Sequence, residues 1–225
     1  MALDRWRRLA WIALGALAAG LLVAASPWQA ALSRPLGDAL LRGLPAAQPL
    51  AGVQVVDLAD AALAALGPQL GRWPFQRDAD AMVVDHLREI GARVIVINLL
   101  FIGPRTGDAA LARSLARPGA LVVLAAAGLL TSIEARPAVP APPADGGAHR
   151  LPALHWPAIV PPAESIWPAP GRPPRSGIVT TPLDADGMLR RLPLWHEAGG
   201  QRWPALALAA WRATASSAAE PGPAG

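Results

Sequence analysis

An uncharged apolar stretch near the N-terminus is the first pattern along the chain. It runs from Leu9 to about Ser26 and follows three arginines within the first eight residues. About 18 helical residues span roughly 27 Å, close to the thickness of the hydrocarbon core of a bilayer. We expect one transmembrane helix in a bacterial inner membrane, with a cytoplasmic N-terminus and all later residues outside. A cleaved signal peptide is the alternative, and it exports the same residues.

The middle of the chain alternates between short apolar runs and amphipathic segments. The apolar runs at 53–56, 93–100 and 120–126 predict strands, and the segments 33–44, 60–66, 78–90 and 108–116 predict helices. The helix 78–90 has the clearest period, because its apolar stripe recurs every three to four residues. That stripe consists of Ala79, Met82, Val83, His86, Leu87 and Ile90. Strands and helices that alternate at this spacing predict a mostly parallel central sheet with flanking helices, an α/β fold.

The C-terminal part begins with a proline-rich region. Twelve prolines lie between Pro137 and Pro174, which predicts a long surface insertion without a core helix or central strand. A hairpin is expected over 177–183 and 188–197, with its turn at 184–187. A helix from Pro204 to about Ala213 and a loose tail over 216–225 complete the chain. The expected organisation is therefore an anchor or signal at 1–28, an exported domain at 29–215, and the tail.

Composition excludes several classes of protein. Hydrophobic residues make up 53% and charged residues 16%, so the chain can bury a core. All 20 basic residues are arginine, and without lysine the chain can form neither a P-loop, nor a protein-kinase site, nor a Schiff base. The absence of cysteine excludes disulfides, thiolate nucleophiles and cysteine-ligated metals. The net charge is +4, but the arginines are scattered, so we expect no nucleic-acid partner.

Six short segments, in the same order, resemble the type-two CHASE family of extracellular sensors associated with cyclases and histidine kinases. The turn W-P-F-Q-R at 73–77 is similar to the family's W-P-W-x-R, and D-A-D-G-M-L-R-R-L-P-L at 184–194 is similar to its D-x-D-G-x-x-R-x-x-P-L. The others lie at 55–63, 91–101, 108–112 and 204–208. The resemblance implies an extracytoplasmic α/β sensor domain, not an enzyme. Two departures are Phe75 in place of the second Trp, and Asn98 in place of the family's usual acidic residue.

Candidate ligand-binding residues follow from strand ends, the turn motif and the resemblance. Asp57 and Asp60 follow an expected strand, where open α/β sheets bind ligands, although ending the strand and capping the next helix is the simpler explanation, since it needs only local geometry. Trp73 and Arg77 either line a pocket or pack a turn over the sheet. The loss of charge at Asn98 puts in doubt any cation or amine site that uses this position.

The turn at 184–187 is a further candidate for ligand binding. Asp184, Asp186 and Arg190 either bind a ligand or form a tight turn in which arginine pairs with aspartate. The spacing does not fit an EF-hand, because prolines occupy the first and last ligand positions. The four histidines lack metal-ligand spacing, and no serine lies in a G-x-S-x-G motif. We expect neither a metal nor a cofactor, and no catalytic residues.

The sequence therefore predicts a membrane-anchored sensor of an unidentified small-molecule or envelope ligand. Family members commonly continue into further membrane helices and an output domain, so we expect a truncated signalling protein that acts as a homo-oligomer or through a separate output protein. Two alternatives remain. One is an exported α/β hydrolase or solute-binding protein, and the other is an envelope domain that has lost ligand binding.

Overall fold

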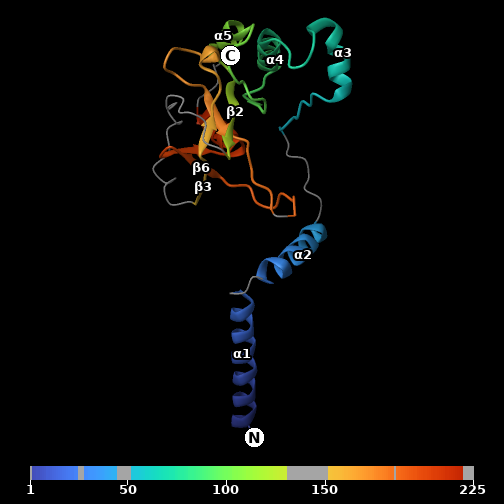
Figure 1. The fold of residues 1–225 in the computed structure, drawn as a ribbon, viewed down its shortest axis with the longest axis vertical. Helices are drawn as coiled ribbons and strands as arrows, with labels where there is room; N and C mark the ends of the chain where they lie inside the picture. The colour runs from blue at the N-terminus through green and yellow to red at the C-terminus, as the bar shows by residue number, and fades with distance from the viewer. Residues whose placement is uncertain (1, 25–27, 45–51, 131–151, 185, 220–225) are drawn as a thin grey trace. The chain divides into compact units, whose positions relative to one another are not determined.

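The structure is a computed structural model that describes residues 2–24, 28–44, 52–130, 152–184 and 186–219. The chain forms two compact units, residues 1–57 and residues 58–225. The first unit contains helix α1 (Ala2–Ala24), helix α2 (Trp28–Gly43) and, among the described residues that follow, the segment Gly52–Asp57, which has no regular structure (Figure 1). The predicted helix at 33–44 is therefore present, and it begins earlier than expected.

The prediction of an N-terminal transmembrane helix is wrong. Among the described residues, none of the helices combines the length and the apolar character needed to cross a membrane. Helix α1 carries Asp4 and three arginines near its start and ends at Ala24, so its uncharged part is Leu9–Ala24. At 1.5 Å per residue this part is about 24 Å long, shorter than a hydrocarbon core of roughly 30 Å.

The second unit is built on a mixed sheet with a parallel core. Strands β1 (Val94–Ile97), β2 (Leu121–Leu129) and β5 (Arg175–Ile178) are parallel, and β2 lies between the other two. The far end of β2 also pairs with the antiparallel strand β4 (Ala158–Val160). The predicted α/β fold with a mostly parallel central sheet is thus confirmed.

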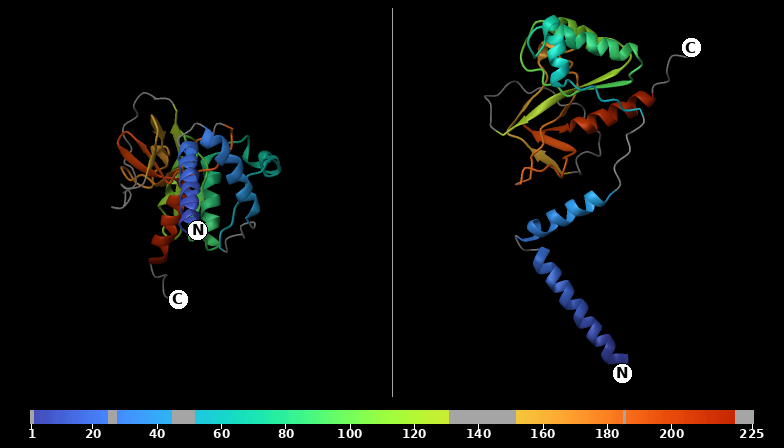
Figure 2. Two further views of the ribbon diagram at one scale, coloured as in Figure 1. Left: turned by 90° about the horizontal axis from the view of Figure 1, so that it is seen from below. Right: turned by 90° about the vertical axis from the view of Figure 1, so that its right-hand side faces the viewer.

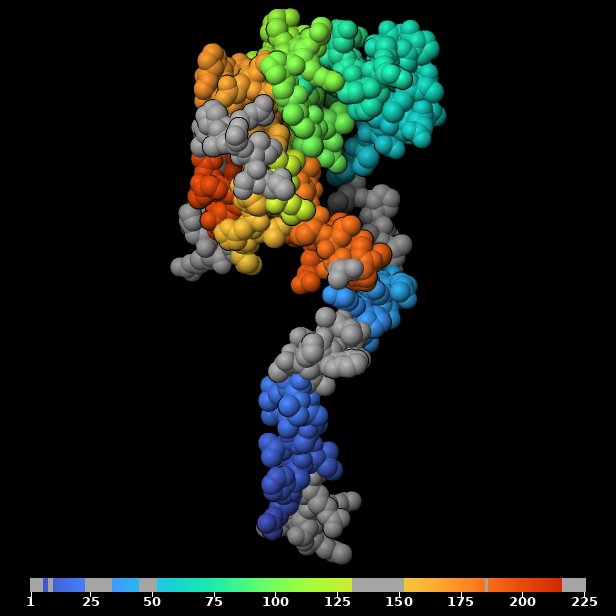
Figure 3. Space-filling model, viewed as in Figure 1, coloured from blue at the N-terminus to red at the C-terminus, as the bar shows by residue number. Residues whose placement is uncertain are grey.

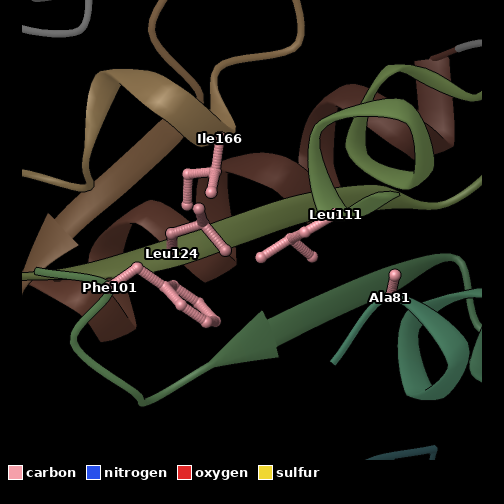
Figure 4. Close-up of a cluster of buried hydrophobic side chains, with 5 residues drawn as sticks. All are labelled: Ala81, Phe101, Leu111, Leu124 and Ile166. Carbon is pink, nitrogen blue, oxygen red and sulfur yellow. The ribbon is translucent and has the colours of Figure 1, made fainter. Parts of the chain in front are cut away.

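Helices cover both faces of this sheet. Helices α4 (Arg77–Glu89) and α5 (Asp108–Ala116) pack on one face, and α6 (Leu206–Ala219) packs on the other (Figure 2). Helix α3 (Asp60–Leu70) precedes α4 and buries no residue. The main core cluster joins α4, the loop after β1, α5, β2 and the short 3-10 helix η2 (Glu164–Ile166), as Figure 4 shows. Its buried members are Ala81, Phe101, Leu111, Leu124 and Ile166.

Helix α4 uses a different face from the predicted one. Ala81 and Val84 are buried against α5 and β1, whereas Met82, Val83 and Ile90 of the predicted stripe are exposed. Polar contacts to α5 explain part of this rotation, because the Ser114 hydroxyl donates to the Asp85 carboxylate at 2.7 Å. The apolar period identified the helix correctly and its core face incorrectly.

The segment 53–56, predicted as a strand, has no regular structure. Val53, Val55 and Val56 are all exposed. A strand needs a paired neighbour to satisfy its backbone, and the described residues provide none for this segment. The helix predicted at 60–66 is present as α3 and extends through Gly67 and Pro68 to Leu70.

The proline-rich region contributes to the core, contrary to prediction. Its described part holds β3 (Ala153–His155), β4 and η2. Trp156 and Ile166 are buried. The prolines of this part lie outside β3 and β4, so β3 can pair with β6 and β4 can pair with β2. The rest of the predicted insertion, residues 137–151, lies outside the described residues.

The predicted hairpin is also misplaced. Strand β5 ends at Ile178 and pairs with β2, while β6 (Trp195–Ala198) forms its hairpin with β7 (Gln201–Pro204). The two joining glycines, Gly199 and Gly200, both have positive φ, as a tight hairpin turn requires. Pro204 therefore ends a strand, and α6 begins at Leu206 and continues beyond the predicted end.

Strand β3 completes this second, three-stranded sheet by pairing in parallel with β6. Its core contains a buried polar pair, in which Trp156 Nε1 donates to His196 Nδ1 at 2.9 Å. Burial lowers the pKa of His196 to about 4. The imidazole is therefore neutral at physiological pH and accepts the indole hydrogen bond.

Candidate functional site

A pocket of about 340 Å³ opens at the carboxyl end of β1. The loop from Asn98 to Gly107 that joins β1 to α5 forms one side, and the N-terminal turn of α4 with the preceding W-P-F-Q-R segment forms the other. Open α/β sheets bind ligands at this end of their strands. The pocket is lined by Trp73, Pro74, Phe75, Arg77, Asp80, Leu99, Leu100, Phe101, Ile102 and Arg105.

Aromatic rings form the apolar part of the pocket. Trp73 and Phe75 meet edge to face with 5.2 Å between ring centroids, and Phe75 is buried while Trp73 is 38% exposed. Phe101 points into the core cluster in Figure 4, and the Arg77 guanidinium lies 4.9 Å from the centre of its ring. The exposed indole of Trp73 is therefore the aromatic surface that a ligand can reach.

Arg77 holds the pocket wall together. Its Nη2 donates to the carbonyl oxygens of Ile102 at 3.4 Å and Gly103 at 3.1 Å, and its Nη1 faces Asp108 Oδ1 at 3.1 Å. The side chain is almost fully buried, and desolvation lowers the pKa of Arg77 while Asp108 opposes that decrease. The guanidinium is committed to these groups, so it positions the loop after β1 rather than binding a ligand directly.

Asp108 joins the same network from the start of α5. Its Oδ2 accepts a hydrogen bond from the Arg105 backbone N–H at 2.8 Å and a short one from the Ser165 hydroxyl. The preceding Gly107 has a φ of 89°, and a Cβ built on it would lie 2.3 Å from the Asp78 backbone nitrogen. The N-termini of α4 and α5 can approach this closely only because position 107 lacks a side chain.

Asp80 and Arg105 provide the charges that line the open part of the pocket. Burial raises the pKa of Asp80 to about 6, with a smaller contribution from Asp78, although Arg77 and Arg105 act in the opposite direction. Arg105 is exposed. A carboxyl group with this pKa changes its charge near physiological pH, and it can either donate or accept a hydrogen bond.

The structure brings two of the predicted site residues, Trp73 and Arg77, together in the pocket. Asn98 directly follows β1, but its side chain is exposed and does not line the pocket. Asp57 lies in the other unit with an exposed side chain. Asp60 is the first residue of α3 and Ala59 is the N-cap, so Asp60 is a negative charge in the first turn of the helix and not its cap.

The predicted residues of the 184–187 turn pair with one another. Arg190 donates to Asp184 at 3.0 Å and to Asp186 at 2.8 and 2.9 Å, and Arg191 contacts Asp184 at 3.4 Å. Hydrogen bonds from Arg190 lower the pKa of both aspartates, that of Asp186 to about 2. The alternative of a tight turn with internal ion pairs therefore describes these residues.

Sequence reasoning missed Asp80 and Arg105. Asp80 lies one helical turn after Arg77, so the i, i+3 rule places both side chains on the same side of α4. Arg105 lies in the loop after the apolar run at 93–100, the position where open sheets collect ligand-binding groups. In the described ranges, no three His, Cys, Asp or Glu side chains come close enough to bind a metal ion together.

Comparison with known proteins identifies the family but provides no close relative. None of the curated proteins and none of the solved structures matches the chain. The CHASE2 domain matches residues 11–222, nearly the whole chain, and this confirms the resemblance seen in the six short segments. This protein therefore belongs to the CHASE2 domain family, whose members are extracellular sensory domains without catalytic activity of their own.

Proposed function

We propose that this chain is the sensory domain of a bacterial signal-transduction protein and that it binds a small molecule in the pocket at the carboxyl end of β1. The observation that carries this proposal is the convergence of an exposed indole, a guanidinium and a titratable carboxyl group around about 340 Å³. Trp73, Arg105 and Asp80 supply these groups. Pockets with an apolar wall and few polar groups are typical of small-molecule sites.

The three groups indicate which ligands the pocket accepts. A planar or apolar body packs on Trp73. A carbonyl, carboxylate or phosphate oxygen of the ligand accepts from Arg105. A hydroxyl or amine donates to Asp80. Sensing requires that the ligand bind one of two conformations more tightly, and the loop after β1, which Arg77 ties to α4, is the element that such a ligand contacts.

A thermal-shift screen of the full-length chain against small metabolites tests the proposal. A ligand at about 100 times its Kd adds about 2.7 kcal/mol of stability, a rise in Tm of roughly 5–10 °C for a domain of this size. Each hit is then measured on Trp73→Ala and Arg105→Ala, which should lose the shift. Matched controls are Trp211→Ala and Arg113→Ala, both exposed outside the pocket. A shift that persists in both pocket variants, or a screen without hits, contradicts the proposal.

A further inference from the structure

Two opposite charges line the pocket without pairing with each other. Asp80 lies in the first turn of α4, and Arg105 lies in the loop before α5. Among the described residues, neither the Asp80 carboxylate nor the Arg105 guanidinium forms a hydrogen bond or an ion pair. Burial has the largest effect on the pKa of Asp80 and raises it, while Arg105 is close enough to act in the opposite direction. The pocket therefore presents one negative and one positive group that a ligand can bridge.

The backbone holds both charged residues in place. The Arg105 N–H donates to Asp108 Oδ2 at 2.8 Å, and the Arg105 carbonyl oxygen accepts from the Asp108 N–H at 3.2 Å. The Arg77 N–H donates to the Thr106 carbonyl oxygen at 3.0 Å, which joins the start of α4, and with it Asp80, to the same loop. Only the two charged side chains have to adjust to a ligand, so binding costs little ordering of the backbone.

The rest of the pocket wall is largely apolar. Its only other charged residue is Arg77, whose guanidinium is already bound to Asp108 and to loop carbonyl oxygens. Trp73, Leu100 and Ile102 are 38%, 43% and 53% exposed and supply apolar surface. The elements that carry the pocket, drawn from teal to green in Figure 3, lie at the surface of the second unit. Further polar groups on a ligand would lose their hydration here without gaining partners.

We propose, resting on the proposed function, that the ligand is a free α-amino acid with an apolar or aromatic side chain. Its carboxylate accepts hydrogen bonds from Arg105, its ammonium group donates to Asp80, and its side chain packs on Trp73. A ligand that is only an anion is repelled by the Asp80 carboxylate, and a ligand that is only a cation is repelled by Arg105. An α-amino acid carries both charges next to one carbon atom and so satisfies both groups. The pocket volume of about 340 Å³ lies at the small end of the range for ligand sites, as a ligand of this size requires.

Isothermal titration calorimetry of the full-length chain tests this assignment. The probes are leucine, methionine, phenylalanine and tryptophan, of which at least one should bind. Each amino acid that binds is compared with its analogues that lack the carboxylate or the ammonium group, which for phenylalanine are phenylethylamine and phenylpropionate. Both analogues should bind at least about tenfold more weakly, because each leaves one charged group of the pocket without its partner. Aspartate and lysine, whose side chains carry an additional charge, should also bind at least about tenfold more weakly.

Two conservative variants assign each charge of the ligand to its partner. Asp80→Asn should reduce the preference for the amino acid over the analogue without the ammonium group to less than about threefold. Arg105→Gln should do the same for the analogue without the carboxylate. A substitution that merely disturbs the pocket would weaken all three ligands alike and leave both ratios unchanged. The matched controls are Asp60→Asn and Arg113→Gln, both exposed outside the pocket, and they should keep both ratios.

Three results overturn this inference: none of the four amino acids binds, an analogue with one charge binds as tightly as the amino acid, or either pocket variant keeps its ratio. A ligand of another class whose binding is lost in Trp73→Ala and Arg105→Ala would refute the amino-acid assignment and leave the proposed function intact. Amino-acid binding that persists in both of these variants would refute the pocket and the assignment together.

Discussion

Asp80→Asn should stabilise the protein at neutral pH and lose this effect in acid. Burial raises the pKa of Asp80 from 3.8 to about 6 in the folded state. Between these values the folded chain binds more protons than the unfolded chain, so the contribution of Asp80 to stability falls as the pH rises from about 4 to about 6. Asparagine resembles the neutral carboxyl group and cannot ionise, so the variant avoids this loss.

The magnitude follows from the difference between the two pKa values. About two pH units correspond to about 3 kcal/mol, and screening at this partly exposed carboxylate reduces this to about 1–2 kcal/mol. Urea denaturation from about pH 4 to pH 7.5 measures the free energy of unfolding of the variant and of the wild type. The difference between the two at each pH cancels the titration of all other groups. Asp60→Asn is the matched control, because Asp60 is exposed in the first turn of α3 and is not among the groups that shift the pKa of Asp80. A difference that stays constant across this pH range refutes the reasoning.

Three further predictions concern the core. Asp108→Ala should lower the free energy of unfolding, measured by urea denaturation, by about 3–5 kcal/mol, because it leaves the buried Arg77 guanidinium unpaired. Adding Arg77→Met should recover part of that loss. Gly128→Ala should destabilise by about 1–3 kcal/mol, since its Cβ would lie 2.4 Å from the Trp156 ring, whereas Gly67→Ala in open space should not. His196→Gln should keep more of its stability than the wild type as the pH falls from about 6.5 to 4. Burial lowers the pKa of His196, so below pH 6.5 the wild-type imidazole gains a proton when the chain unfolds, and the variant has no such group. Thermal melts over this pH range measure the difference. Equal pH dependence of His196→Gln and the wild type would contradict this assignment.

The elements with the strongest local signals could be predicted from the sequence. Helix α5 has the predicted bounds, and β1 and β2 form as parallel neighbours, because continuous apolar runs between helices are explained only by burial on both faces. Turn chemistry also succeeded locally. At the predicted turn the Asp184 N–H donates to the Met188 carbonyl oxygen at 2.9 Å, and the Gly187 N–H donates to the Asp184 carbonyl oxygen at 2.8 Å.

Pairing between distant segments could not be predicted in the same way. The turn at 184–187 indicated a hairpin, but β5 pairs with β2, some fifty residues earlier in the chain, and no local pattern encodes that choice. The pocket shows the same limit. Arg77 was a candidate, yet its partners Ile102, Gly103 and Asp108 come from the next loop and helix, so only the fold shows that its charge is already used. The pKa of Asp80 likewise depends on burial that its immediate neighbours do not determine.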